Sequence, residues 1–304
     1  MSDRQTDWQR VEQLFGADVL AHLRRQRVAV VGLGSGGGFV AQSLAMSGVG
    51  HFVLIDSDIL SAANVVRHVA DLRDVGRPKV HAVADLLRQR NPQVDVQAIV
   101  GRVEEHVALL GEVDLVVAGV DGEQPKYAIN QACLERGRVA VYAGVYERGQ
   151  GGDVCIIYPD DGPCYACWAQ QVRASMAEAP AEELDYGMIG PDGTLAAEPG
   201  LWLDVVRVAA VQADVALGHL LASTDRRRPL PANTVILANT YLEIFEGQTA
   251  LPYTAEWIKV ERNPQCLVCG PLRTGRAPQQ LSLQDLATLG HVTIEEEDDE
   301  PKRK

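Results

Sequence analysis

A cluster of glycines between a short apolar run and an amphipathic segment constrains the fold more than any other feature of this sequence. The run Arg27–Val31 is apolar and β-branched and ends at Gly32, which is typical of a buried parallel strand. Gly32, Gly34 and Gly37 then satisfy the spacing G-x-G-x-x-G, and a helix is predicted to about Ser47. Such glycines permit a tight turn, and the helix N-terminus offers N–H donors to a phosphate. The sequence therefore predicts a phosphate-binding turn.

Strands and helices continue to alternate through the first half of the chain. Strands are predicted at 51–56, 94–100, 114–119 and 139–144, and helices at 78–89, 103–110 and 124–136. This alternation indicates right-handed βαβ units. We therefore expect an α/β, Rossmann-like fold with a mostly parallel sheet and helices on both faces.

The pattern changes after about residue 149, where antiparallel elements are predicted. These are a strand at 152–158, a long helix at 203–221, and antiparallel strands at 234–245 and 257–261. Residues 171–200, rich in Ala, Glu, Gly and Pro, predict an extended crossover loop.

The domain organisation expected from this pattern is a single domain over residues 1–270. Its nucleotide-binding half is 1–150, and 151–270 holds the crossover loop, the long helix, the antiparallel strands and two cysteine pairs. Residues 271–304 form a tail whose acidic end is expected to be disordered.

Charge and hydropathy restrict the ligands and the compartment. The 304 residues carry a formal net charge of −13, which argues against nucleic acid as the main ligand. The segment Met1–Arg10 is polar and predicts no signal peptide. The longest apolar stretch, 205–222, is interrupted by Gln212 and Asp214 and predicts a buried helix, not a membrane span. We therefore expect a cytoplasmic protein.

Polar residues after the second predicted strand distinguish ATP from NAD. Asp56 ends this strand, where a carboxylate can bind ribose hydroxyls of either nucleotide. Asn64, Arg67 and Lys79 follow. Fixed cations stabilise the charge that develops on pyrophosphate when ATP is cleaved between its α- and β-phosphates, and a dehydrogenase has no need of them. Taken alone, Arg67 could be a surface charge and Lys79 an ordinary helix-start residue.

This arrangement resembles the ThiF/MoeB/HesA family, which also supplies the adenylation domains of ubiquitin-activating enzymes. The resemblance covers about residues 10–270 and implies ATP and Mg²⁺ as cofactors. It implies that Asp56 holds the ribose and that Asn64, Arg67 and Lys79 contact the triphosphate. Asp58 is placed with them as a nucleotide-binding residue.

Two further roles come from the same resemblance. The family carries an Asp that binds Mg²⁺ or positions the attacking carboxylate, and Asp121 matches it, although its neighbours Val120 and Gly122 depart from the family's Thr-Asp-Asn. Arg10 matches an N-terminal Arg that reaches into the partner subunit's ATP site, which implies a homodimer. A plain surface arginine is the alternative for Arg10.

Four of the six cysteines form two C-x-x-C pairs, Cys164 with Cys167 and Cys266 with Cys269. Four thiolates in tetrahedral array predict a structural zinc site with no open position. Free buried thiols or redox pairs are the alternatives. The other two cysteines, Cys133 and Cys155, are predicted to be buried small hydrophobes.

The predicted activity is ATP-dependent adenylation of the C-terminal glycine carboxylate of a small ubiquitin-like or sulfur-carrier protein. Residues 168–265 contain no cysteine, so no thioester on the crossover loop is expected. Ser175 is the nearest loop hydroxyl, but no base adjoins it. A downstream conjugating enzyme or sulfurtransferase would then receive the acyl group.

Three alternatives remain open. The chain could activate a peptide or a modified tRNA carboxylate, or it could be an inactive scaffold subunit of a heterodimeric activator. The third is an NAD(P) oxidoreductase, which the cations Arg67 and Lys79 disfavour.

Overall fold

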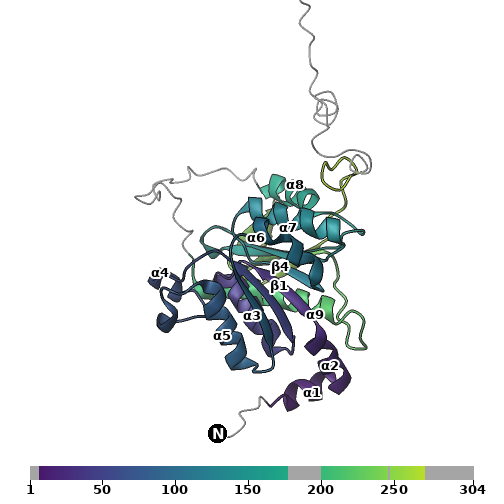
Figure 1. Cartoon of the computed structure of the whole chain (residues 1–304). Helices are drawn as coiled ribbons and strands as arrows, with labels where there is room; N and C mark the ends of the chain where they lie inside the picture. Colours follow the sequence, from purple (N-terminus) through teal and green to yellow (C-terminus); the bar gives the residue numbers. More distant parts are fainter. Residues whose placement is uncertain (1–6, 177–199, 246, 271–304) are drawn as a thin grey trace, which may run out of the picture.

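One twisted sheet organises the chain, with helices on both of its faces (Figure 1). The computed structural model describes residues 7–176, 200–245 and 247–270. The sheet has eight strands in the order β10-β7-β6-β5-β4-β1-β2-β3. Its strands are β1 (Arg27–Val31), β2 (His51–Asp56), β3 (Asp95–Val100), β4 (Leu115–Ala118), β5 (Ala140–Val145), β6 (Gly151–Ile157), β7 (Thr234–Ala238) and β10 (Ala255–Ile258).

Parallel pairing joins β3, β2, β1, β4 and β5, and antiparallel pairing joins β5 to β6, β6 to β7 and β7 to β10. A separate two-stranded sheet consists of β8 (Leu242–Phe245) and β9 (Gln248–Ala250). The predicted fold class, a mostly parallel Rossmann-like sheet extended by antiparallel strands, is therefore confirmed.

Most helices pack against one of two apolar cores, and α4 packs in a small separate cluster. The α-helices are α1 (Gln9–Phe15), α2 (Ala17–Arg25), α3 (Ser35–Met46), α4 (Ala62–Val65), α5 (Lys79–Arg90), α6 (Val103–His106), α7 (Glu123–Arg136), α8 (Tyr165–Met176) and α9 (Trp202–Leu220). Short 3₁₀ helices are η1 (Leu72–Asp74), η2 (Val107–Glu112) and η3 (Glu147–Gly149).

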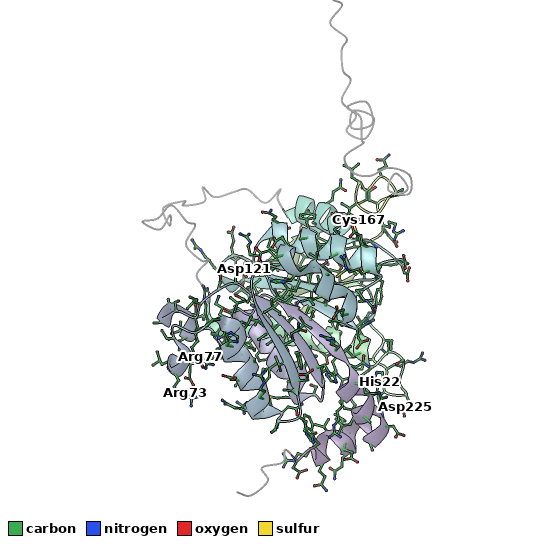
Figure 2. All side chains as sticks on the ribbon, viewed as in Figure 1. His22, Arg73, Arg77, Asp121, Cys167 and Asp225 are labelled. Atoms are coloured by element: carbon green, nitrogen blue, oxygen red, sulfur yellow. The ribbon has the colours of Figure 1, made fainter. Side chains whose placement is uncertain are left out.

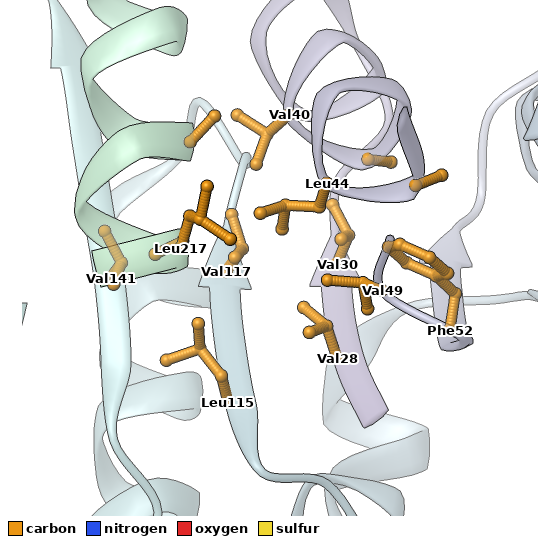
Figure 3. Packing of buried hydrophobic residues seen from close by; sticks show 14 of the residues in the cluster. Val28, Val30, Val40, Leu44, Val49, Phe52, Leu115, Val117, Val141 and Leu217 are labelled. Carbon is orange, nitrogen blue, oxygen red and sulfur yellow. The ribbon is translucent and has the colours of Figure 1, made fainter. Parts of the chain in front are cut away.

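Side chains of each central strand point alternately into the two cores. Val28 and Val30 of β1 pack with α2, α3, α5 and α9, whereas Ala29 and Val31 face α7 and α8. Figure 3 shows Leu44 of α3 and Leu217 of α9 over the strands of the first core. Because β1 is buried on both faces, its sequence is continuously apolar.

The structure differs from the sequence predictions around the first cysteine pair. The crossover loop is predicted to start at residue 171, but residues 165–176 form the helix α8. Tyr165 and Trp168, in its first turn, are buried against the sheet, and this tertiary burial favours the helix. The rest of the predicted crossover loop, 177–199, and the tail 271–304 lie outside the described residues.

The predicted strand 234–245 is divided at Asn239. The backbone N–H of Asn239 donates to the Gln150 carbonyl (2.8 Å), and its side-chain amide donates to the Gly149 carbonyl (2.9 Å). These contacts fix the chain to the β5–β6 turn, so β7 ends and β8 starts in a different sheet. The last strand begins at Ala255, two residues earlier than predicted.

The glycine turn lies at the switch point of the sheet. β1 has β2 on one side and β4 on the other, so the connections leaving β1 and β4 diverge there. The buried amide of Gln212 on α9 donates to the carbonyls of Ala118 (2.9 Å) and Val141 (3.2 Å), which ties α9 to the ends of β4 and β5.

The N-terminal helices α1 and α2 lie at the end of the sheet opposite to the glycine turn (Figure 1). Since α2 ends just before β1 begins, it lies at the end of the sheet where the parallel strands start. Trp8 and Leu20 both approach Gly48, which precedes β2. Within the described residues, no helix combines the length and apolar character needed to cross a membrane.

Candidate functional site

Three glycines pack backbone against backbone at the ends of β1 and β4. Gly32 has a φ of +83°, and a Cβ on Gly119 would lie 2.6 Å from the Gly32 oxygen. A Cβ on Gly37 would lie only 1.9 Å from that same oxygen. Gly34 differs, because a Cβ there would meet nothing within 4 Å. Gly32, Gly37 and Gly119 therefore let the segments approach, whereas Gly34 borders open space at the N-terminus of α3.

Asp56, at the end of β2, orders two loops at once. Its Oδ2 accepts the Leu33 N–H (2.6 Å), and its Oδ1 accepts the Asp58 N–H (2.7 Å). Burial raises the pKa of Asp56, while these two N–H groups and the charge of Lys79 act in the opposite direction. The carboxylate thus fixes the glycine turn and the segment after β2.

Lys79 begins α5 and forms an ion pair with Asp58. Its Nζ lies 2.7 Å from Asp58 Oδ2, and its backbone N–H donates to the Asp58 carbonyl (2.9 Å). The lysine side chain is 10% exposed and the aspartate side chain 62% exposed. This ion pair keeps a mostly buried ammonium group beside Asp56.

The helix α4 and the residues directly after it place Asn64 and Arg67 at the same end of the sheet as Asp56. Asn64 Oδ1 accepts hydrogen bonds from Ser61 N (3.0 Å) and Ser61 Oγ (2.9 Å). The Arg67 N–H donates to the Asn64 carbonyl (2.9 Å), and the next residue, His68, hydrogen-bonds the Leu33 carbonyl (2.7 Å). Arg67 is therefore one residue from a direct contact with the glycine turn.

Asp121 joins this group through Gly119. It is exposed, and it follows Gly119 by two residues, which span at most about 7 Å. Since Gly119 touches Gly32 and Gly37, the structure places Asp121 near the glycine turn. Figure 2 shows Asp121 at this end of the molecule and Asp225 at the other.

Of the residues predicted to act on the nucleotide, Arg10 is the one that the structure does not bring to this group. It is exposed on α1, beyond the edge of the sheet opposite to the glycine turn. Any role for Arg10 in nucleotide chemistry therefore requires the site of another protomer.

Sequence reasoning assigned no role to two residues of the site, Gly119 and His68. A glycine directly after a buried strand was an available signal for Gly119. The role of His68 depends on a contact 35 residues away in the chain, and no local pattern predicts it.

The two C-x-x-C pairs converge into one cluster. The Sγ atoms of Cys164, Cys167, Cys266 and Cys269 all lie within 4.8 Å of one another. The separations are 3.8 Å for Cys164–Cys167, 3.7 Å for Cys164–Cys266 and 3.4 Å for Cys167–Cys269. Tetrahedral zinc with Zn–S bonds of 2.3 Å requires sulfur separations of about 3.8 Å. The cluster is compatible with zinc.

The two sides of the cluster are held by different contacts. On α8, Tyr165 stacks between Tyr142 and Trp168, with ring centroids at 4.5 and 5.4 Å. The Tyr165 N–H donates to Asn130 Oδ1 (2.9 Å), so the first pair is held by the core. In the Cys266–Cys269 turn, Gly270 N donates to the Cys266 carbonyl (2.8 Å), and the side-chain amide of Asn263, just before the turn, donates to Gln170 of α8 (2.9 Å).

The remaining cysteines lie away from any such cluster among the described residues. Cys133 and Cys155 are buried, as predicted. Burial raises the pKa of Cys133 to about 12, so its thiol stays protonated and weakly nucleophilic at neutral pH.

Comparison with known proteins identifies the relatives of this chain. The model of the ThiF family matches residues 6–267. The SAMP-activating enzyme E1 of Haloferax volcanii is 30% identical over 259 residues, which are 84% of each chain. The molybdopterin-synthase adenylyltransferase of Escherichia coli is 28% identical over 84% of this chain and 92% of its own length.

One further relative matches only part of this chain, and a solved structure shares its fold. Ubiquitin-like modifier-activating enzyme 5 of Caenorhabditis briggsae is 32% identical over half of this chain, which spans only 38% of that relative. The crystal structure of E. coli MccB with ATP superposes with a TM-score of 0.63 at 19% identity, covering 88% of this chain and 76% of the other. At this identity the superposition supports the fold alone.

The glycine packing predicts opposite outcomes for two matched substitutions. Gly119→Ala places a Cβ against backbone atoms of Gly32 and Gly37 and should lower the free energy of unfolding by about 1–3 kcal/mol. Gly34→Ala meets open space and should change it by less than about 0.5 kcal/mol. Urea unfolding of both variants measures the difference, and equal stabilities would contradict the packing described above.

Proposed function

The chain belongs to the ThiF family, and from this premise we propose that it uses ATP to adenylate the C-terminal glycine carboxylate of a small ubiquitin-like or sulfur-carrier protein. The observation that carries the proposal is the convergence of Asp56, Lys79 and Asp121 around a glycine turn with open space at Gly34. Two relatives that match over most of their length support it by their names, a SAMP-activating enzyme E1 and a molybdopterin-synthase adenylyltransferase.

Each residue of the candidate site has its own role in nucleotide binding in this proposal. The N-terminus of α3 and the Gly34 region receive phosphate oxygens, because unpaired helix N–H groups attract anions. Asp56 holds the ribose. The Asn64 amide nitrogen, Arg67 and Lys79 contact the triphosphate. Asp58 then exchanges its ion pair with Lys79 for a place in the nucleotide site.

The reaction is an in-line displacement at the α-phosphorus. A carboxylate oxygen of the carrier protein forms a bond to this phosphorus, and the bond to the β-phosphate bridging oxygen breaks. Pyrophosphate leaves with the electron pair, and an acyl-adenylate remains. Arg67 and Lys79 stabilise the charge that develops on the leaving group. Asp121 would supply an oxygen donor to a bound Mg²⁺, whose charge would offset that of the phosphates, or would position the attacking carboxylate.

Arg10 completes the site from a partner protomer in this proposal. The position of α1 at the opposite edge of the sheet supports a contribution in trans and not in cis. The acyl group then passes to another molecule, a conjugating enzyme or a sulfurtransferase, because residues 168–265 offer no thiol to receive it. We place the enzyme in the cytoplasm.

The proposal predicts ATP–pyrophosphate exchange that depends on Asp121. With a carrier protein ending in glycine, Asp121→Ala should reduce exchange below about 1% of wild type while leaving the unfolding midpoint unchanged, because its side chain is exposed. Asp225→Ala, an acid at the other end of the molecule, is the matched control and should retain full exchange.

Full exchange by Asp121→Ala would overturn the assignment of the site. Exchange with a free peptide but with no carrier protein would favour the peptide-activating alternative. Absence of exchange with either, together with tight NAD binding, would overturn adenylation altogether.

We also propose that Cys164, Cys167, Cys266 and Cys269 hold one structural Zn²⁺. Four thiolates leave no position for a substrate, so this ion would stabilise and not catalyse. Metal analysis of the purified chain should give about one zinc per protein, and Cys266→Ser should lose most of it. Cys133→Ala, which alters a buried thiol outside the cluster, should keep the metal.

Loss of the metal should act on the two sides of the cluster unequally. Hydrogen exchange should accelerate strongly at residues 262–270 and little at 165–172, because the aromatic stack holds α8 independently. Retention of zinc by Cys266→Ser, or equal acceleration on both sides, would contradict this assignment.

A further inference from the structure

We propose that His68 is a positioning residue that aims the Gly34 N–H at the nucleotide phosphate, acting through the peptide bond between Leu33 and Gly34. The proposal rests on the nucleotide site proposed above and goes beyond it, because it adds a residue with no ligand contact of its own.

The Leu33 backbone is held from both sides. Asp56 Oδ2 accepts its N–H at 2.6 Å, and the His68 ring hydrogen-bonds its carbonyl oxygen at 2.7 Å. Leu33 is fully buried, and its neighbours Gly32 and Gly34 are glycines, which by themselves restrict the backbone little. The two side chains therefore supply the rigidity that the glycine turn lacks.

Planarity of the peptide bond transmits this restraint to Gly34. The Leu33 carbonyl and the Gly34 N–H belong to one trans peptide plane and point in opposite directions. With the carbonyl directed at His68, the Gly34 N–H points away from it. No hydrogen bond from this N–H to a described residue is present, and the space around the Gly34 Cα is open.

The hydrogen bonds also determine the state of the imidazole. The Ala70 N–H donates to His68 Nδ1 (3.0 Å), so Nδ1 carries no proton. Nε2 must then carry the proton and donate to the Leu33 carbonyl. Only neutral His68 makes both contacts, because protonation would place an N–H at Nδ1 against the Ala70 N–H.

The surroundings favour the neutral form. Burial lowers the pKa of His68, and the hydrogen bond to Leu33 acts in the opposite direction. The charged groups that act on the ring are Lys79 of α5, which lowers this pKa, and Asp56 of β2 and Asp74 of η1, which raise it. Since the pKa lies below the ordinary value of 6.5, protonation and loss of the Ala70 contact occur only in acid below that value.

The substitutions that test this role are His68→Ala and His68→Gln. Glutamine keeps an N–H donor near the position of Nε2 but cannot titrate. The half-exposed His51, at the opposite edge of the sheet, provides the control His51→Gln. Affinity for the ATP analogue AMPCPP with Mg²⁺ is measured by calorimetry and requires no carrier protein.

At about pH 8, His68→Ala should bind AMPCPP about tenfold more weakly than wild type, because the Leu33 carbonyl loses its partner. His68→Gln should bind within about threefold of wild type, and His51→Gln should equal it. Below pH 6.5, wild type should lose affinity relative to His68→Gln as the ring takes up a proton and gives up the Ala70 contact. Titration of the nucleotide is common to both proteins and cancels in their ratio.

A wild-type affinity for folded His68→Ala would overturn the proposal, and so would a His68→Gln affinity as low as that of His68→Ala. Should His68→Ala fail to fold, His68→Leu, which also lacks the N–H donor but keeps side-chain volume, takes its place in the same comparison. Nucleotide binding without pyrophosphate exchange would count against the proposed function and leave the role of His68 supported by its own binding data.

Discussion

Close backbone contact between the glycine turn and Gly119 is the constraint on which the rest of the structure depends. Gly32, Gly37 and Gly119 leave no room for a Cβ, so β1 and β4 can end side by side with their loops in contact. This contact brings Asp121, which follows β4, to the turn that follows β1. Parallel pairing with β2 adds Asp56 at the same edge, and Asp56 in turn holds Leu33. The candidate site is thus a consequence of strand order and small residues.

Side chains around the glycine turn hold its backbone in place at this end of the sheet. Asp56 and His68 hold the backbone N–H and carbonyl of Leu33. Asp58, after β2, forms an ion pair with Lys79 at the start of α5. The cysteine cluster has a corresponding position elsewhere, because it joins the Cys266–Cys269 turn to a helix held by aromatic stacking. In both places a few side-chain contacts connect a turn of the backbone to its surroundings.

The sequence predicted those parts of the fold and site that depend on local spacing. Gly32, Gly34 and Gly37 with Asp56 and the two C-x-x-C pairs follow short-range patterns, and the structure brings each set together. The helix at 165–176, the break at Asn239 and the contact of His68 with Leu33 depend on residues distant in sequence, so no local pattern could predict them. Arg10 stays a prediction, because its role needs a second protomer.

In the proposed reaction, a protein carboxylate attacks the α-phosphorus of ATP in this site. To test this step, a glycine-ending carrier protein is incubated with the chain and MgATP. Its mass is then measured by intact-mass spectrometry, and the nucleotide products are analysed in parallel. We expect a carrier whose C-terminus bears AMP, with pyrophosphate as the other product. Formation of ADP and phosphate, or AMP appearing on no carrier while the nucleotide stays bound, would contradict it.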